Sequence, residues 1–201
     1  EVGLARNMEV TMVSTNLREH PVFRSLSWER FHGAALAAVG HLLSDSVRRI
    51  VISSSYPKVF FRPWGSLWKT DHLWSSSILE MAHFGEDRWR FEKLELIADV
   101  PLVREHLRIC WEHRNDQLNC GRCEKCLRTM LALLSIGRLD FYPTFPNEAA
   151  LLENLRKTRR IHDHLIPTYR GFLKRGLPPD AEKAVRQLIR RSKPAAGNSK
   201  H

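Results

Sequence analysis

The pattern of apolar and polar positions predicts alternating strands and helices in the first part of the chain. The run Met8–Ser14 is typical of a short strand. Trp28–Leu43 carries its apolar residues at helical spacing, with Ser27 as its N-cap. Arg49–Ser53 is a continuous run rich in β-branched residues, as expected of a strand that is buried on both faces. A strand, a helix and a strand with short connections predict a right-handed parallel unit of an α/β sheet.

The segment after this second strand is rich in serine, proline and aromatic residues. In parallel sheets, the loops that leave the carboxyl ends of the strands build the ligand crevice. The segment is therefore a candidate substrate-binding loop, with an aromatic wall and a polar floor. The alternatives are an ordinary polar loop and tryptophans that simply cover the core. The candidate residues are Ser53, Ser54, Tyr56, Trp64, Gly65, Ser66 and Asp71.

The remaining pattern predicts mostly helices. The pattern predicts a helix over Glu124–Ile136, with leucines and Met130 on one face and Gly137 ending it. Asn147 is predicted to cap a further helix. Other predicted helices are Ile78–Phe84, Lys93–Ala98, Leu102–Leu107, His162–Lys174 and Asp180–Arg191, predicted strands are Trp89–Phe91 and Leu107–Trp111, Asp140–Pro146 is a predicted linker, and Ser192–His201 is a predicted disordered tail.

Composition and charge narrow the class of protein. The 201 residues are 43% hydrophobic, which is enough for a sizeable core and excludes wholesale disorder. No apolar run is long enough for a membrane span, so no membrane partner is expected. The chain begins Glu1-Val2-Gly3 rather than with Met, from which we expect a fragment of a longer protein.

The net charge of +10 is concentrated at the end of the chain. From Leu155 onward there are thirteen basic and three acidic residues, and the preceding part is neutral. A basic tail of this kind can bind nucleic acid or an acidic partner. The alternative is that the lysines and arginines coat the outer faces of solvated helices. The residues considered for nucleic-acid binding are Arg156, Lys157, Arg159, Arg160, Lys174, Arg175, Arg190 and Arg191.

The four cysteines, Cys110, Cys120, Cys123 and Cys126, all lie in one short window. Four clustered cysteines in a sequence without a leader favour a metal site over a disulfide framework. Free thiols of this kind are typical of a reducing compartment, so we expect a cytoplasmic protein. Four thiolates in a tetrahedron make a closed structural zinc site, and Gly121 permits the tight turn between two of them. Such a site would join the predicted strand near Cys110 to the helix that follows Cys126. An iron–sulfur cluster and four reduced thiols without metal are the alternatives.

These residues resemble a known family. Arg108–Trp111 followed by Asn119–Thr129 resembles the C-terminal zinc module of 7-cyano-7-deazaguanine synthase and its relatives, which are PP-loop (N-type) ATP pyrophosphatases. Glu92–Ala98 resembles the Lys-x-Glu-Ile segment of that family, and Val51–Ser55 resembles the strand and loop that carry the activated substrate. The resemblance covers roughly residues 8–137.

The resemblance implies a fold and an activity. The fold would be an adenine nucleotide alpha hydrolase-like parallel sheet (residues 1–105), a four-cysteine zinc module (106–137) and a basic helical extension (138–201). The activity would be ATP- and Mg²⁺-dependent adenylation of a small-molecule carboxylate or carbonyl group for nitrogen transfer. Lys93 would contact phosphate, and Asp71 matches an acidic residue of the substrate loop.

One departure from the family changes this expectation. The family's phosphate loop, Ser-Gly-Gly-x-Asp-Ser, does not occur in this chain. We therefore expect the chain to be the C-terminal part of a longer enzyme, with an incomplete ATP site of its own. The alternative function is a zinc-stabilised nucleic-acid-binding module that uses the basic C-terminal helices.

Overall fold

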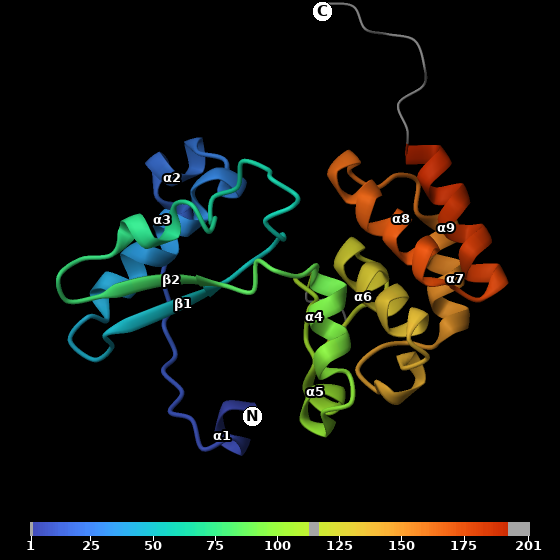
Figure 1. Ribbon diagram of the computed structural model, residues 1–201, viewed down its shortest axis with the longest axis horizontal. Coiled ribbons are helices and arrows are strands. Elements are labelled where there is room, and N and C mark those ends of the chain that lie inside the picture. Colours follow the sequence, from blue (N-terminus) through green and yellow to red (C-terminus); the bar gives the residue numbers. More distant parts are fainter. Residues whose placement is uncertain (1, 113–116, 193–201) are drawn as a thin grey trace, which may run out of the picture. The chain divides into compact units, whose positions relative to one another are not determined.

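The chain forms two compact units in a computed structural model that describes residues 2–112 and 117–192 (Figure 1). Among the described residues, Asn7–Lys93 form one unit, which we call the sheet unit. Val2–Arg6 and the chain from Leu94 onward form the other, which we call the helical unit. The three segments predicted from the sequence (1–105, 106–137 and 138–201) follow the family resemblance and not the contacts between residues, and they remain predictions.

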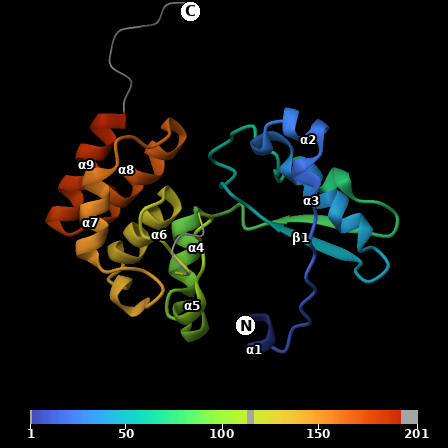
Figure 2. The same ribbon diagram turned by 180° about the vertical axis from the view of Figure 1, so that it is seen from behind.

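The sheet unit is built on two parallel strands, β1 (Arg49–Ser53) and β2 (Glu80–Phe84). Their register pairs Arg49 with Glu80 and Ser53 with Phe84, so both strands end at the same edge. Helix α3 (Trp28–Leu42) lies along one face of the pair, as Figure 2 shows from behind. The core between them consists of Ala37, Ile52, Leu79 and Met81. The remaining elements of the unit are the 3₁₀ helices η1 (Leu17–Glu19) and η2 (Asp71–Trp74), and helix α2 (Pro21–Ser25).

Gly33 of α3 allows a close approach between the helix and the loop that follows β1. The N–H of Gly33 donates to the carbonyl oxygen of Gly65 at 2.9 Å, and the N–H of Gly65 donates to the carbonyl of Glu29 at 2.6 Å. A Cβ at position 33 would lie 2.0 Å from the Gly65 oxygen. The absence of a side chain at Gly33 therefore fixes where this loop crosses the helix.

Two predicted elements of the sheet unit are corrected by the structure. Residues 8–14 are not a strand: they are exposed and irregular, and no described strand pairs with them. Residues Ile78–Phe84 are not a helix, because Glu80–Phe84 are β2. Leu, Glu, Met and Ala favour helices when considered alone. Pairing with β1 overrides that preference and buries the alternate residues Leu79 and Met81.

Two shorter predicted strands are also wrong. Trp89 precedes helix α4 (Arg90–Ile97), and its N–H donates to the Glu92 carboxylate at 2.7 Å, which is a capping arrangement. Leu107–Trp111 lies outside the regular elements, since side-chain hydrogen bonds from Asn119 hold this segment instead of a strand partner. The predicted helix at Lys93–Ala98 corresponds to the second half of α4, which ends at Ile97.

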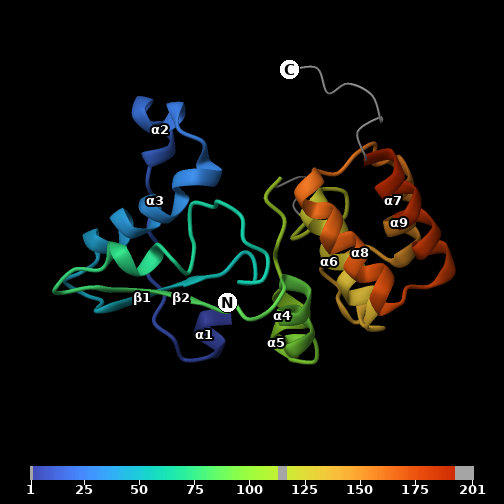
Figure 3. The ribbon, with the colours of Figure 1, turned by 45° about the horizontal axis from the view of Figure 1, so that its top comes forward.

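The helical unit is a bundle in which α6 packs against α7 and α8, and α9 packs against α7 and α8 (Figure 3). Its core contains large side chains that are completely buried, such as Leu131, Leu155, Tyr169 and Phe172. The basic helices therefore share a core with the helix that follows the cysteines. The elements are α1 (Val2–Ala5), the end of α4, α5 (Pro101–His106), α6 (Glu124–Ser135), η3 (Leu139–Phe141), α7 (Glu148–Lys157), η4 (Asp163–Leu165), α8 (Ile166–Arg175) and α9 (Pro179–Ser192).

Most predictions for this unit are confirmed. The helices predicted at Glu124–Ile136 and Asp180–Arg191 are α6 and α9, and Asn147 caps α7 by accepting from the N–H of Ala150 at 3.1 Å. The predicted linker contains more structure than expected, because Tyr142 and Phe145 are buried in it. The predicted tail lies beyond the described residues, apart from Ser192, which ends α9.

The coarse fold class is confirmed as a helix-rich α/β protein with a small parallel sheet. Among the described helices, none combines the length and the apolar character that crossing a membrane would require.

Candidate functional site

The four cysteines converge at the start of α6. Their sulfur atoms all lie within 4.8 Å of one another, with Cys110 and Cys123 3.9 Å apart and Cys120 and Cys126 3.8 Å apart. Sulfurs at the corners of a tetrahedron with ~2.3 Å metal–sulfur bonds are about 3.8 Å apart. All four side chains are buried. The cluster is therefore able to hold one metal ion, and the residues present fit a structural zinc ion.

Asn119 fastens the segment that carries Cys110 to the rest of the cluster. Its side-chain oxygen accepts from the N–H groups of Ile109 at 3.0 Å and Cys110 at 3.2 Å. Its side-chain nitrogen donates to the carbonyl oxygens of Leu107 at 2.7 Å and Thr144 at 3.2 Å. In the sequence, Asn119 stands out only as part of the cysteine motif. The spacing of the cysteines does not show which backbone groups a buried amide side chain will bond.

The turn between Cys120 and Cys123 is held from both sides. Gly121 has a φ of +65°, which glycine adopts without strain, and a Cβ there would lie 2.3 Å from the ring of Pro146. The side chain of Asn154, on α7, donates to the carbonyl oxygen of Gly121 at 3.2 Å. The N–H of Cys123 points at the sulfur of Cys120 at 3.3 Å. The predicted role of Gly121 is consistent with this geometry.

The thiols of the cluster differ in acidity. Burial raises the pKa of Cys110, but hydrogen bonds from the N–H groups of Cys120 and Glu112 outweigh this and bring the pKa to about 6. Burial raises the pKa of Cys123 to about 11 and raises that of Cys126 still further. Protein groups alone thus favour the thiolate at Cys110 and the thiol at Cys123 and Cys126. A bound divalent cation would supply the charge that ionises the others.

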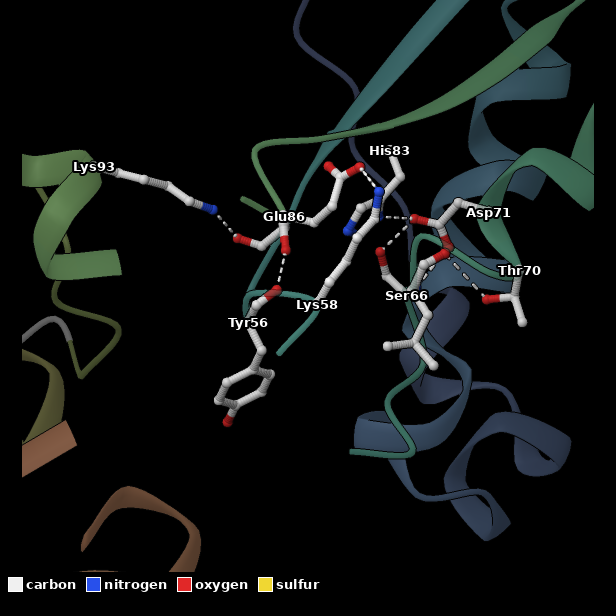
Figure 4. Close-up of polar contacts among 10 residues, drawn as sticks. Tyr56, Lys58, Ser66, Thr70, Asp71, His83, Glu86 and Lys93 are labelled. Atoms are coloured by element: carbon white, nitrogen blue, oxygen red, sulfur yellow. Dashed lines mark hydrogen bonds and ion pairs between the residues drawn. The ribbon is translucent and has the colours of Figure 1, made fainter. Parts of the chain in front are cut away.

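A second polar cluster lies where β1 and β2 end (Figure 4). Ser54 follows β1, is buried, and donates from its hydroxyl to the carbonyl of Tyr56 at 2.5 Å. Lys93 donates from Nζ to the carbonyl oxygen of Ser54 at 2.9 Å. Burial lowers the pKa of Lys93, and the neighbouring Arg90 lowers it further. Ser54, Tyr56 and Lys93 are therefore brought together, whereas Ser53 ends β1 with an exposed side chain.

Asp71 is completely buried and is the centre of a hydrogen-bonded network. One carboxylate oxygen accepts from the Ser66 hydroxyl at 2.6 Å and contacts Nδ1 of His83 at 2.7 Å. The other accepts from the N–H of Leu67 at 3.0 Å. His83 belongs to β2 and was not predicted as a site residue, because the histidines show no ligand pattern in the sequence.

A small cavity lies beside this network. Its volume is about 10 Å³, close to the space that one water molecule needs. The predicted residues Ser54, Tyr56 and Ser66 line the cavity, but Trp64 and Gly65 do not. Asp71 is not in the lining either, although it contacts Ser66 and His83, which are. The full lining is Ser54, Tyr56, Pro57, Phe60, Phe61, Ser66, Leu67, Trp68 and His83.

The loop after β1 does not fit the phosphates of ATP. The N–H of Ser54 already donates to the carbonyl of Phe84 at 2.8 Å, and the run Ser53–Ser55 contains no glycine. Backbone N–H groups that wrap a pyrophosphate must be free and closely spaced. This loop by itself therefore does not form a phosphate-binding loop.

Several basic residues of the C-terminal helices have partners within the unit. Arg191 donates to the carbonyl oxygens of Leu155 and Arg156, both at 3.0 Å, and so satisfies the end of α7. Arg175 pairs with Glu95, Lys157 with Glu153, and Arg160 with Asp163. A separate groove is lined mainly by cations; its residues are Arg170, Leu173, Arg186, Ile189 and Arg190, with Lys183 lining the adjoining hollow.

Comparison with known proteins found no matching family model, no matching curated protein and no matching solved structure.

Proposed function

We propose that this chain is the C-terminal part of an ATP pyrophosphatase of the PP-loop type, similar to the 7-cyano-7-deazaguanine synthase group. In this proposal the sheet unit is part of an adenine nucleotide alpha hydrolase-like sheet. The longer protein activates a small carboxylic acid or carbonyl compound for nitrogen transfer. The protein works in the cytoplasm, where four free thiols stay reduced.

The observation that carries the proposal is the polar cluster at the carboxyl ends of the two parallel strands. Ligands of open α/β sheets bind at this edge. Here the edge gathers Ser54, Tyr56 and Lys93 with the buried pair of Asp71 and His83, from four separate parts of the sheet unit. Such a concentration of buried polar groups has a cost to folding that a binding site would explain.

The metal in this proposal is zinc, and its role is structural. Sulfurs 3.8–3.9 Å apart suit one tetrahedral ion, and all four positions are occupied by cysteine, which leaves no position for a substrate. When bound, the ion supplies the positive charge that keeps the thiolates ionised. Elemental analysis of the purified chain should find about one zinc ion per chain, and iron would contradict this part of the proposal.

The proposed activity is tested on the longer protein. The reading frame upstream should encode a strand followed by Ser-Gly-Gly-x-Asp-Ser, and that protein should release pyrophosphate from ATP. Lys93→Met should lower the rate by roughly 10²-fold, the usual effect of losing one positioned charge-stabilising group. Lys183→Met, on α9, is the control and should have no effect. An unrelated upstream domain, or equal rates in both variants, would contradict the proposal.

The cationic groove between α8 and α9 favours a second candidate function, binding to nucleic acid. Arg170, Arg186 and Arg190 are exposed and line the same groove, which phosphate groups could occupy. Arg186 also pairs with Glu182 at 2.7 Å, so part of the charge is already compensated.

This second candidate is tested by measuring the salt dependence of binding to a short RNA duplex and a short DNA duplex. Replacing Arg186 and Arg190 with alanine should weaken binding and reduce the slope of log K against log salt by about two. The control replaces Arg24 and Arg30, exposed arginines of the sheet unit, and should leave the slope unchanged. Equal slopes for both variants would exclude the groove as the binding surface.

A further inference from the structure

His83 has the environment of a residue with a fixed tautomer. Its Nδ1 lies 2.7 Å from a carboxylate oxygen of Asp71, and that oxygen also accepts from Ser66. An ionised carboxylate only accepts hydrogen bonds, so this contact with an ionised Asp71 requires a proton on Nδ1 of His83. A neutral ring in that tautomer has its lone pair on Nε2. This nitrogen is on the side of the ring that faces away from Asp71 (Figure 4).

Asp71 is held firmly enough to impose this tautomer. The carboxylate is fully buried, and it accepts from Ser66, Leu67 and His83. Leu67 donates its backbone N–H to this carboxylate from the loop that Gly33 brings against α3. The side chain of His83 is itself only 6% exposed. Rotation of either partner would leave a buried polar group unsatisfied.

The cavity next to His83 is suited to a very small molecule. Its volume of about 10 Å³ admits one non-hydrogen atom with its hydrogens, such as water or ammonia. Its walls are mostly apolar and aromatic, with Tyr56, Phe60 and Trp68 among them, and no carboxylate lines it. The hydroxyl of Ser54 is already used to donate to Tyr56. The imidazole of His83 is the basic group in the lining.

We propose that His83 is the proton acceptor for a one-atom N–H or O–H nucleophile held in this cavity, and that Asp71 is its positioning residue. As the lone pair of the nucleophile forms a bond to a carbonyl carbon and the C=O π pair moves to oxygen, an N–H or O–H bond of the nucleophile breaks: its proton moves to Nε2 and its bonding pair stays on the nucleophile. His83 becomes an imidazolium whose Nδ1–H stays bonded to Asp71, and Asp71 remains ionised. The Lys58–Glu86 ion pair lies near His83 and supplies charges of both signs. In the proposed function the nucleophile is ammonia and the electrophile is the activated carbonyl group, and only these two assignments rest on that function.

The test is nitrogen NMR of the complete zinc-loaded chain with ¹⁵N-labelled histidine rings. The His83 signals are identified as those lost in His83→Gln. They should show a protonated Nδ1 and an unprotonated Nε2. His41 is the internal reference, because its Nε2 lies 2.8 Å from the carbonyl of Trp74 and must carry the proton. Asp71→Asn should raise the population of the Nε2-protonated tautomer of His83 and leave His41 unchanged. A role limited to packing would not depend on the tautomer.

The occupant is identified by titration with ammonium chloride, with sodium chloride and tetramethylammonium chloride as controls. A shift of His83 Nε2 with ammonium alone identifies ammonia, and a contact between bound water and the ring without that shift identifies water; both outcomes support the site. An Nε2-protonated His83 in the wild-type chain, or neither contact, would overturn the inference. If the longer protein releases no pyrophosphate while these signatures hold, the proposed function fails and the site stands.

Discussion

Asn119 shows how much of the candidate metal site depends on a single residue that is not among its four possible ligands. Its side chain makes four hydrogen bonds, which join the segment of Cys110 to the turn of Cys120 and to Thr144. Without Asn119, the buried N–H of Cys110 and three partly buried backbone groups would lose these hydrogen bonds. At the residue scale, the cluster is thus positioned by an amide as well as by the sulfurs.

Asn119→Ala should lower the free energy of unfolding by about 3 kcal/mol, because several buried backbone groups lose their partner. It should also weaken zinc binding by roughly 10- to 100-fold, as loss of a residue supporting the ligands does. Asn154→Ala, which removes one bond to Gly121, is the matched control and should cost about 1 kcal/mol. Denaturant unfolding and competition with a zinc chelator measure both effects. Equal losses for the two variants would contradict the special role of Asn119.

The unequal acidities of the thiols predict their order of reaction in the metal-free chain. Iodoacetamide should modify Cys110 first at pH 7, since a thiol with a pKa of about 6 is then mostly thiolate. Its rate should be constant above that pH, whereas the rate of Cys123, with a pKa of about 11, should keep rising up to pH 10. Peptide mass analysis after timed labelling gives the rates. Zinc should protect all four cysteines, and faster labelling of Cys123 at pH 7 would refute the assignment.

At the scale of elements, the crossing of α3 and the loop after β1 decides where the strand-end cluster forms. The contact of Gly33 with Gly65 anchors the loop just before Ser66, whose hydroxyl bonds to Asp71. A shift of this crossing would move Ser66 away from the carboxylate. The packing of one helix glycine therefore controls the geometry of a polar site on another element.

Gly33→Ala should destabilise the protein by about 2 kcal/mol, although alanine favours helices, because the added Cβ meets the Gly65 oxygen at 2.0 Å. Ala38→Gly, at an exposed position of the same helix, should cost about 1 kcal/mol from helix propensity alone. Thermal unfolding measures the stability of both variants. The tautomer of His83 should change only in the Gly33 variant, and an unchanged His83 signal in it would show that the crossing does not control the site.

The elements also show what the sequence can reveal. The apolar spacing of α6 and α9 and the cap of α7 depend on local physics, so they were predicted correctly. The strand β2 depends on pairing with β1, and the extended segment before Cys110 depends on the distant Asn119. For the candidate site, the spacing of cysteines predicted a cluster that the structure brings together, whereas the contact of Asp71 with His83 required the register of a strand that had been assigned as a helix.

At the scale of the whole molecule, the four-cysteine cluster and the strand-end cluster belong to different compact units. The four cysteines lie in the helical unit, and the cluster around Asp71 lies in the sheet unit. A structural metal stabilises the fold that carries its ligands. Metal should therefore affect the two units unequally.

Removal of zinc with a chelator should reduce hydrogen-exchange protection in α6 and α7 and leave β1 and β2 unchanged. The physical reason is that the cysteine cluster lies at the start of α6, and its turn is bonded to α7 through Asn154. The sheet core of Ile52, Leu79 and Met81 shares no residue with the cysteine cluster. Exchange followed by mass spectrometry resolves the regions. Equal loss of protection in the strands would show that the two units fold as one.

The cover of the cysteine turn imposes an order on biosynthesis. Pro146 and Asn154 close over Gly121, and both follow the last cysteine in the chain. A ribosome therefore synthesises all four cysteines before it makes the residues that cover the turn. Complete burial of an ion in the cluster would require that α7 has been translated as well.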